Sequence, residues 1–337
     1  MQRVALKHSI DYKPRATDFA LVDAPFPACP ADGVVVRIVH LSLDPYVGQR
    51  IRGRHMGEHA PAPMRDAIPG AIVGQVIESR TPALAEGDWV HSMDGGWQEF
   101  APLASANVRK IDPTATPLAA HAGVLGMPGL TAWAGMMQLA HVTLGDVVLV
   151  DAAAGPVGGT AGQIARIRGA ERVIGIAGGA EKCALATHAY GFDDCIDYQA
   201  DGWRDALKSA LPDGLSVFFE NVSAEMAMIA LSHARLYARG VLCGLVDAYH
   251  AATPAQHPLN AGMIIGKRAQ LSGLVVYDFY PRWDEYVEEA SPWIRDGRLN
   301  YVEDRVEGLA AAPALFERLM DGRNIGKAVV SVAPEII

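Results

Sequence analysis

Cysteine is scarce in this sequence, which limits the kinds of fold and site that it can form. Four cysteines occur among 337 residues, and they are far apart in the chain: Cys29, Cys183, Cys195 and Cys243. Because no two of them form a CxxC pair, we expect neither a disulfide framework nor a cysteine-rich zinc site. This pattern is typical of a protein from a reducing compartment, and it predicts a cytoplasmic location.

Positive charge and long apolar runs are also in short supply. The 29 Lys and Arg residues are outnumbered by 38 Asp and Glu, which gives a formal net charge of −9. Nucleic-acid-binding proteins usually present a basic face, so we expect no nucleic-acid partner. No segment approaches the roughly 20 apolar residues that cross a bilayer, and the first residues contain no apolar stretch of signal-peptide length. We therefore expect no membrane partner.

Apolar residues make up half of the sequence, which is ample for packed cores. A chain of 337 residues favours two domains over one, because a single core stops growing well before that length. The early part of the chain has β-branched runs with turn residues between them, and these predict strands at 34–43, 71–78 and 87–91. The first domain is therefore expected to be β-rich.

After residue 117 the pattern changes to an alternation of short apolar strands and helices. Strands are predicted at 146–151, 172–177, 194–197, 215–219 and 240–244. Helices are predicted at 157–169, 180–191, 202–211, 224–237, 281–297 and 309–322. Short apolar strands between helices indicate an α/β fold with a parallel sheet covered by helices on both faces. The last predicted strand, 327–332, has no partner helix and is expected to return to the β-rich domain.

A Gly-rich turn follows the first strand of this alternation. Compared with G-x-G-x-x-G, the segment from Ala153 to Gly158 has alanine in place of the first glycine. Gly155 would let the backbone approach a pyrophosphate, Gly158 would let helix and strand pack closely, and the helix N-terminus would offer N–H groups to the anion. The motif alone leaves open a βα turn whose small residues serve packing. With the βα series that follows it, the turn predicts a dinucleotide-binding domain.

The end of the second strand of the series favours NADP(H) over NAD(H). An NAD site normally has an Asp or Glu there, which binds the ribose 2′-hydroxyl. Here the strand is followed by Gly178 and Gly179, and Lys182 comes on the opening turn of the next predicted helix. The missing acid leaves room for a 2′-phosphate, and Lys182 supplies a positive charge to meet it. The alternative for Lys182 is an ordinary solvated helix lysine.

Sequence motifs occur along almost the whole chain. Two of them are Leu-Ser-Leu-Asp-Pro-Tyr at 41–46 and Gly-Met-Pro-Gly-Leu-Thr-Ala at 126–132. Others lie at 69–74, 87–90, 152–158, 220–222 and 324–327. Together they resemble zinc-independent medium-chain dehydrogenase/reductases of the branch that includes leukotriene dehydrogenase/prostaglandin reductase, plant alkenal double-bond reductases and bacterial curcumin reductase-like enzymes. The first two motifs are specific to this branch.

The resemblance implies a GroES-like β-rich catalytic domain at 1–126 and 302–337 and a Rossmann NADP-binding domain at 127–301, commonly in a homodimer. It implies that Lys182 and Tyr198 bind the 2′-phosphate end, and that Asn221 and the segment 243–249 line the nicotinamide half. The segment 274–276 would back the nicotinamide ring. The implied cofactor contacts are Gly155, Pro156, Val157, Gly158, Lys182, Tyr198, Asn221, Cys243, Gly244, Tyr249, Leu274, Val275, Val276 and Asn324.

Zinc-dependent relatives place a Cys and a His-Glu pair in the β-rich domain. The corresponding segments here, 42–46 and 69–74, contain no Cys, His or Glu, whereas catalytic zinc needs about three protein ligands. His55 and His59 have a spacing that chelates metal on a helix, but they lie in a Pro-rich loop with no third ligand. We therefore expect no metal.

The chemistry expected without metal is NADPH-dependent reduction of the C=C bond of an α,β-unsaturated ketone or aldehyde. Hydride adds to the β-carbon, and the protein must stabilise the enolate oxygen with a hydrogen bond. A tyrosine phenol is a suitable neutral donor, and the candidates are Tyr46, Tyr249 and Tyr277. Each of them can equally be a packing residue with a wet hydroxyl.

One departure from the family pattern concerns the tyrosine of animal prostaglandin reductases. That tyrosine falls in the segment 260–267, where Gly266 stands here. The difference disfavours eicosanoid substrates and moves the emphasis to Tyr46 and Tyr249, which we expect at the catalytic site. Quinone reduction and a non-catalytic NADPH-binding scaffold or sensor remain alternatives.

Overall fold

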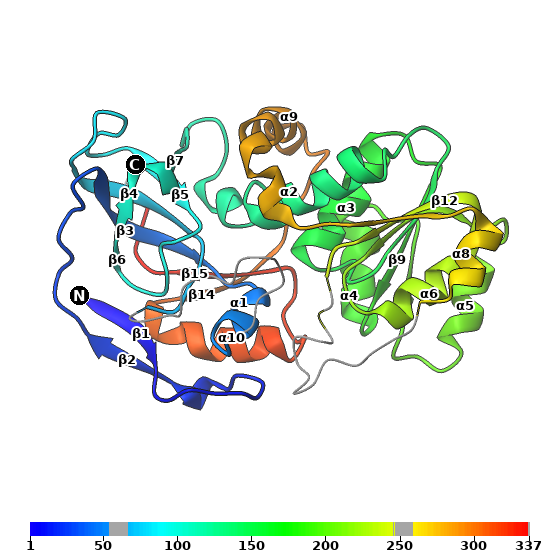
Figure 1. The fold of residues 1–337 in the computed structure, drawn as a ribbon, viewed down its shortest axis with the longest axis horizontal. Helices are drawn as coiled ribbons and strands as arrows, with labels where there is room; N and C mark the ends of the chain where they lie inside the picture. The colour runs from blue at the N-terminus through cyan, green and yellow to red at the C-terminus, as the bar shows by residue number, and fades with distance from the viewer. Residues whose placement is uncertain (54–66, 245, 247–258, 336–337) are drawn as a thin grey trace. The chain divides into compact units, whose positions relative to one another are not determined.

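The computed structural model describes residues 1–53, 67–244, 246 and 259–335. These residues form two compact units. Unit 1 comprises Met1–Gly123 and Glu303–Ile337, and unit 2 lies within 124–302. Figure 1 shows strands prevailing in the blue and cyan segments of unit 1 and helices around a sheet in unit 2. Each unit is described by itself below.

The main sheet of unit 1 is antiparallel over most of its width. Its order is β14-β15-β3-β4-β5-β7, and β6 also pairs with β3. The strands are β3 (Gly33–Ser42), β4 (Ile72–Ser79), β5 (Trp89–Ser92), β6 (Phe100–Ala104), β7 (Arg109–Lys110), β14 (Glu303–Glu307) and β15 (Lys327–Ser331). Because β15 pairs antiparallel with β3, the predicted return of the last strand to the β-rich domain is confirmed. Strands β1 (Gln2–Leu6) and β2 (Phe19–Asp23) form a separate antiparallel pair.

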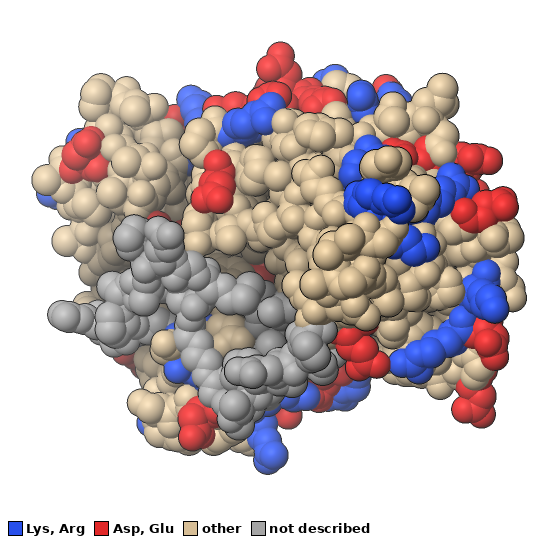
Figure 2. Space-filling view, turned by 45° about the vertical axis from the view of Figure 1, so that its right-hand side comes forward, with Lys and Arg blue, Asp and Glu red and all other residues tan. Residues whose placement is uncertain are grey.

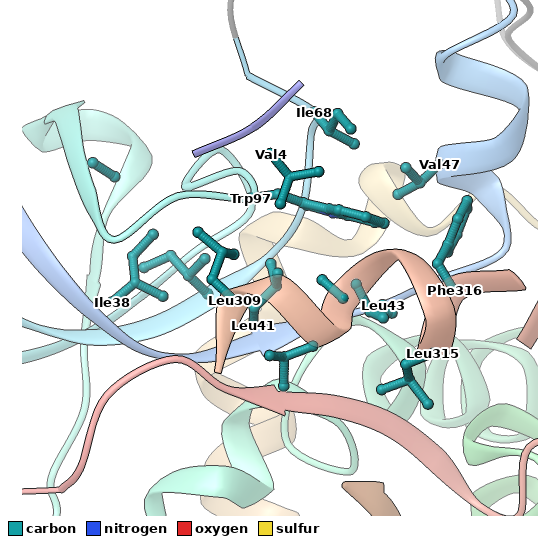
Figure 3. Close-up of a cluster of buried hydrophobic side chains, with 14 of the residues drawn as sticks. Val4, Ile38, Leu41, Leu43, Val47, Ile68, Trp97, Leu309, Leu315 and Phe316 are labelled. Atoms are coloured by element: carbon teal, nitrogen blue, oxygen red, sulfur yellow. The ribbon is translucent and has the colours of Figure 1, made fainter. Parts of the chain in front are cut away.

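Aliphatic side chains and a few aromatic rings fill the core between this sheet and helix α10 (Ala312–Met320) (Figure 3). The Trp97 ring is fully buried, stacks on Phe19 at 5.5 Å and meets the Phe316 ring edge-on at 5.2 Å. Such pairs contribute about 0.5–1.5 kcal/mol beyond the burial of their area. A Cβ at Gly48, in the short helix α1 (Tyr46–Arg50), would lie 2.6 Å from Met320 Cε, so α1 packs tightly against α10.

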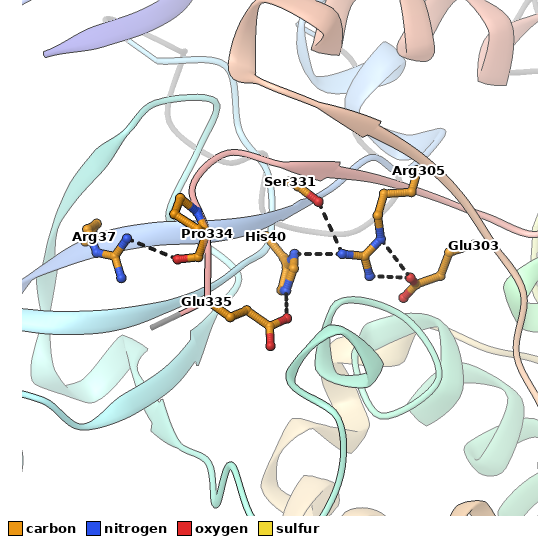
Figure 4. A network of polar contacts seen from close by, with 7 residues as sticks. All are labelled: Arg37, His40, Glu303, Arg305, Ser331, Pro334 and Glu335. Atoms are coloured by element: carbon orange, nitrogen blue, oxygen red, sulfur yellow. Dashed lines mark hydrogen bonds and ion pairs between the residues drawn. The ribbon is translucent and has the colours of Figure 1, made fainter. Parts of the chain in front are cut away.

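A polar network ties the last described residues of the chain to β3 (Figure 4). His40 is buried, and its Nε2 lies 2.5 Å from Glu335 Oε1. Arg37 donates to the Pro334 carbonyl at 3.3 Å, and Arg305 donates to Ser331 Oγ at 3.2 Å. Burial lowers the pKa of His40, although the Glu335 carboxylate opposes that shift.

Unit 2 contains a parallel sheet of order β10-β9-β8-β11-β12-β13. Its strands are β8 (Val147–Val150), β9 (Arg172–Ala177), β10 (Asp194–Asp197), β11 (Leu215–Glu220), β12 (Ala234–Leu242) and β13 (Gln270–Gly273). Its helices are α2 (Met127–Trp133), α3 (Pro156–Ile167), α4 (Ala180–Ala184), α5 (Trp203–Ala210), α6 (Ala224–Ser232), α8 (Ala261–Lys267) and α9 (Trp283–Arg295). The expected α/β class, a β-rich unit joined to a doubly wound parallel sheet, is confirmed.

The structure corrects the sequence prediction around residue 233. A helix was expected to run to Tyr237, but α6 ends at Ser232 and β12 begins two residues later. Leu236 and Tyr237 mimic an apolar helix face, yet they are 57% and 71% exposed. Tyr237 also has a φ of 65°, which lies in the left-handed region and is incompatible with a continuing α-helix.

The motif at 126–132 proves to be a packing element of unit 2. A Cβ at Gly129 would lie 1.7 Å from the Val124 carbonyl oxygen and 2.3 Å from the Tyr286 hydroxyl. That hydroxyl donates to the Val124 carbonyl, and Trp283 Nε1 donates to the Leu125 carbonyl at 3.0 Å. Glycine is therefore required where α2 meets α9.

The described surface carries both signs of charge. Figure 2 shows basic and acidic side chains interspersed on the face that it draws. Within the described part of the chain, no helix is long and apolar enough to span a membrane.

Candidate active site

The Gly-rich turn joins the end of β8 to the start of α3 in unit 2. Ala152 takes a φ of 44°, in the left-handed region, and Gly155 N–H donates to the Ala152 carbonyl at 2.8 Å. Gly155 is the N-cap of α3 in an extended conformation, and Pro156 occupies the first helical position. Proline fits there because the first N–H groups of a helix have no intrahelical acceptor. The remaining N–H groups of this turn are available to an anion.

Gly155 and Gly158, at the start of α3, have different environments. A Cβ at Gly158 would lie 2.5 Å from the Ala152 carbonyl oxygen and 2.7 Å from the Asp151 carbonyl oxygen, so no side chain fits. A Cβ at Gly155 would meet only the Ala152 oxygen, at 3.2 Å. Gly158 thus serves the close packing of helix on strand, whereas the space beside Gly155 is open to a ligand.

The residues predicted in unit 2 to contact a cofactor all follow the carboxyl ends of parallel strands or lie in the turn itself. Lys182 and Tyr198 come after β9 and β10, Asn221 after β11, Cys243 and Gly244 after β12, and Leu274 to Val276 after β13. In open α/β sheets, ligands bind outside the carboxyl ends of the strands. The topology therefore brings these residues to one edge of the sheet.

At the β9 end of that edge, Tyr198 lies against the glycines that replace the usual acid. A Cβ at Gly178 would lie 3.0 Å from Tyr198 Oη, and Gly179 N–H donates to Asp197 Oδ1 at 2.8 Å. The Tyr198 side chain is 48% exposed. Partial burial lowers the pKa of the Lys182 amine on α4, while Glu181 opposes that shift. A phenol hydroxyl and a lysine thus lie on the segments that follow two adjacent strands.

The strand order reverses between β8 and β11, the switch point at which dinucleotides cross such sheets. Asn221 lies at this point, 6% exposed, and its side-chain amide donates to the Asp151 carbonyl at 3.3 Å and to Asp151 Oδ1 at 3.2 Å. The Asn221 carbonyl also lies against Gly244, where a Cβ would approach it to 2.8 Å. Burial raises the pKa of the neighbouring Cys243 thiol to about 12, so this thiol is neutral.

The segment after β13 contributes apolar side chains. Leu274 is buried and its N–H donates to the Leu242 carbonyl at 2.9 Å. Val275 and Val276 are partly exposed. Tyr277, a candidate for contact with the substrate, is 41% exposed and lies on the segment that leads to α9. An apolar platform at this edge suits a flat ring.

In unit 1, a buried ion pair fixes the segment that carries Tyr46. Lys327 Nζ donates to Asp44 Oδ1 at 2.8 Å and to the Leu43 carbonyl at 2.5 Å, and Ser42 Oγ donates to Asp44 Oδ2 at 2.5 Å. Tyr46 begins helix α1 and packs against the core of unit 1.

Asn324, three residues before Lys327, is buried and donates to the Gly326 carbonyl at 2.7 Å. The Asp44–Lys327 ion pair therefore joins two family motifs within unit 1, the segments 41–46 and 324–327.

Three residues of the sequence predictions lie outside the described residues: Tyr249, His55 and His59. Within the described ranges, no group of three or more His, Cys, Asp or Glu side chains is arranged to hold a metal ion.

Two buried carboxyls at the switch point, Asp151 and Glu220, did not figure among the predicted site residues. Their positions directly at the ends of two apolar strands were the available signal, because a charged residue there is expected to face a ligand or a partner.

Comparison with known proteins places this geometry in a family. Residues 2–111 match the model described as "N-terminal domain of oxidoreductase", and residues 156–294 match the model described as "Zinc-binding dehydrogenase". The chain is 37% identical over 315 residues to NADPH-dependent curcumin reductase of Escherichia coli (strain K12), covering 91% of this chain and 90% of that one. The chain belongs to the medium-chain dehydrogenase/reductase family.

Other relatives support the same branch. The NADP(+)-dependent 2-alkenal reductase of Nicotiana tabacum is 36% identical over 99% of this chain and 98% of its own length. The crystal structure of CurA from Vibrio vulnificus in complex with NADPH superposes with a TM-score of 0.90 at 32% identity, covering 99% of this chain and 100% of that one. The family resemblance read from the motifs is therefore confirmed.

Proposed function

We propose that this protein is an NADP(H)-dependent oxidoreductase that reduces the C=C bond of α,β-unsaturated ketones or aldehydes. The observation that carries the proposal is the edge of the parallel sheet. It combines a Gly-rich turn, glycines in place of an acid directly after β9, and Lys182 and Tyr198 on neighbouring segments. Relatives named as NADPH-dependent curcumin reductase and 2-alkenal reductase are 37% and 36% identical to this chain over nearly their whole length.

The residues of unit 2 fit a dinucleotide. Gly155 leaves space for a pyrophosphate beside the start of α3, and its neighbours Pro156, Val157 and Gly158 complete the turn. Lys182 and Tyr198 would bind a 2′-phosphate, since a charge-assisted hydrogen bond is stronger than a neutral one. Asn221, Cys243 and Gly244, with Leu274, Val275 and Val276, would line the nicotinamide half, and Asn324 of unit 1 would also contact the cofactor.

Bound NADPH would supply a hydride for the β-carbon, and solvent would supply the proton for the α-carbon. The protein's own task is to hold the carbonyl oxygen as negative charge develops on it. We assign this role to a tyrosine phenol, with Tyr46 and Tyr249 as the candidates and Tyr277 as a further substrate contact. A phenol remains protonated at neutral pH and donates one hydrogen bond.

The domain limits of the proposal are 1–126 and 302–337 for the catalytic domain and 127–301 for the NADP-binding domain. A homodimer in the cytoplasm, without metal, is also part of the proposal. Light scattering on the purified protein measures its mass, and metal analysis measures bound zinc.

The direct test is NADPH consumption with matched acceptors, namely an enone, its saturated ketone and a quinone, with product identification by mass spectrometry. We expect the enone to give the saturated ketone and the saturated ketone to give no turnover. Turnover of quinones alone would instead favour quinone reduction, and tight NADPH binding without turnover on any acceptor would favour a scaffold.

Tyr46→Phe tests the role of the phenol. Loss of one oxyanion donor lowers kcat by roughly 100-fold in other enzymes. We expect a fall of that order for an enone with unchanged NADPH affinity. Unchanged kcat and KM would exclude Tyr46 as the donor.

A further inference from the structure

Two carboxyls that form no ion pair with the described residues are buried at the switch point of the unit 2 sheet. Asp151 directly follows β8 and Glu220 is the last residue of the adjacent strand β11. Asp151 is 4% exposed and Glu220 is 3% exposed. Buried carboxylates are unfavourable unless they are paired or hydrogen-bonded, so each oxygen of this pair must be accounted for.

One oxygen of each carboxyl accepts backbone or amide N–H groups. Glu220 Oε1 accepts from the N–H groups of Val222 at 2.7 Å and Ser223 at 2.6 Å. Asp151 Oδ1 accepts from the Asn221 backbone N–H at 2.7 Å and from its side-chain amide at 3.2 Å. Asp151 Oδ2 is buried, and no N–H or hydroxyl donor of the described residues reaches it.

The side chain that does interact with Asp151 is the other carboxyl, that of Glu220. Two ionised carboxylates repel each other and have no hydrogen to share, whereas one proton between them gives a hydrogen bond and removes one charge. Burial and mutual repulsion raise the pKa of Glu220, and burial raises the pKa of Asp151. Cys243, which interacts with both carboxyls, is neutral because burial also raises its pKa.

The pair also determines how the Asn221 amide is oriented. Both acceptors of the Asn221 NH₂ group belong to Asp151, so the amide nitrogen points to β8. The Asn221 side-chain oxygen is then left to accept a hydrogen bond from elsewhere. A ribose hydroxyl of a dinucleotide that crosses the switch point is a donor of the required chemistry.

We propose that Asp151 and Glu220 are positioning residues that share one proton, and that this singly charged pair holds the Asn221 amide with its oxygen toward a ribose hydroxyl of the bound dinucleotide. The inference rests on the proposed NADPH binding. In addition, Asp151 and Glu220 must keep one proton between them while the cofactor is bound. NADPH binding alone does not require this.

Loss of the shared proton would place a second negative charge below a ligand whose diphosphate is already negative. Because the interior screens charge weakly, that repulsion weakens binding. By linkage, the Kd for NADPH rises by up to tenfold for each pH unit above the titration of the pair. Lys182 also loses charge at high pH, so the contribution of the pair must be separated from that of the lysine.

The decisive variant is Glu220→Gln. Its amide keeps an oxygen for the Val222 and Ser223 N–H groups and has a permanent N–H for Asp151 Oδ2, so it mimics the protonated pair and cannot titrate. The matched control is Asp213→Asn, which removes an exposed carboxylate elsewhere in unit 2 and should keep the wild-type pH profile. Lys182 is present in all three proteins.

The experiment measures the Kd for NADPH by fluorescence between about pH 7 and pH 11, because burial and mutual repulsion raise the pKa of Glu220 to about 11. We expect the Kd of the wild type and of Asp213→Asn to rise about twofold more than that of Glu220→Gln over this range, since half of the pairs have lost the shared proton at the pKa. Equal pH dependence in Glu220→Gln and wild type would overturn the inference.

A second measurement guards against a folding defect. Thermal melts of the proteins without cofactor report whether Glu220→Gln is folded, and Asp151→Asn gives the same test if it is not. Asn at 151 still accepts from Asn221 and donates to Glu220, so it too should lose the additional pH dependence. Wild type that fails to bind NADPH at any pH would contradict the proposed function itself, whereas binding with no effect of either variant would contradict only the shared proton.

Discussion

Replacing Gly158 and Gly155 separately by alanine distinguishes a glycine needed for packing from one needed for ligand access. The new methyl at 158 would lie 2.5 Å and 2.7 Å from two backbone oxygens, whereas ordinary contact begins at 3.4 Å. Backbone atoms cannot turn aside as a side chain can, so β8 and α3 must separate. Forcing an extra methyl into a packed site costs about 1–3 kcal/mol.

Part of that cost is offset because alanine favours a helix over glycine by about 0.5–1 kcal/mol. The net expectation for Gly158→Ala is a loss of about 1–2 kcal/mol. For a domain of this size each kcal/mol lowers Tm by about 2–4 °C, so we expect Tm to fall by about 2–8 °C. Thermal unfolding followed by circular dichroism measures this change.

Gly155→Ala should show the opposite behaviour. Its φ of −83° is allowed for alanine, and its nearest contact would be 3.2 Å, so the expected change in Tm is small. The methyl would instead occupy the space through which a pyrophosphate approaches the backbone. We expect the Kd for NADPH to rise at least about tenfold, equivalent to 1.4 kcal/mol.

Gly266→Ala provides a control, because a Cβ there meets nothing within 4 Å. It should leave both Tm and NADPH affinity close to wild type. A wild-type Tm for Gly158→Ala would contradict the packing role of Gly158. Wild-type NADPH affinity for Gly155→Ala would contradict the role of Gly155 in ligand access.

Three further predictions concern charged or titratable side chains. Lys182→Ala should raise the Kd for NADPH about 10- to 150-fold and that for NADH far less, since a charge-assisted hydrogen bond contributes about 1.5–3 kcal/mol; equal losses would remove the 2′-phosphate role. Lys327→Met should destabilise the protein by about 3–5 kcal/mol in urea unfolding, because it leaves buried Asp44 without its partner. Burial lowers the pKa of His121 from 6.5 to about 4. Between these two values the unfolded chain binds a proton at His121 that the folded chain does not bind. The free energy of unfolding therefore falls as the pH drops from 6.5 toward about 4. His121→Gln should therefore reduce the loss of stability between pH 6.5 and 5 by up to about 1.4 kcal/mol per pH unit, and an unchanged slope would contradict this.

The parallel sheet was predictable because its strands are short apolar runs with clear ends. Strand β8 is fully buried on both faces, and the Gly-rich turn marks its end. Strand β13 was missed because it has four residues, two of them polar and none fully buried. Its pairing with β12 depends on a neighbour that the local sequence does not reveal.

The position of the candidate cofactor residues followed from topology rather than from any single residue. Once the strands are known to be parallel, Lys182, Tyr198 and Asn221 must come to one edge, and the structure has them there. The sequence analysis predicted no helix at Tyr46, whereas this residue begins helix α1. The short motif 41–46 gave no sign of the ion pair that fixes this segment, because Lys327 lies 283 residues from Asp44.

The pair of Asp151 and Glu220 shows that the role of an acid in such a sheet depends on which strand it follows. An NAD site carries its acid after the second strand, and the sequence indicated NADP(H) because that acid is missing. The structure has acids at the ends of the first and fourth strands instead, Asp151 and Glu220, which are distant in sequence and lie on adjacent strands only because the strand order reverses there. At those positions a carboxylate does not contact a 2′-hydroxyl. It lies at the switch point, where the proposed shared proton would let it remain buried beside an anionic ligand. An acid at this strand end would then orient the Asn221 amide toward the cofactor, whereas an acid after the second strand would select the cofactor.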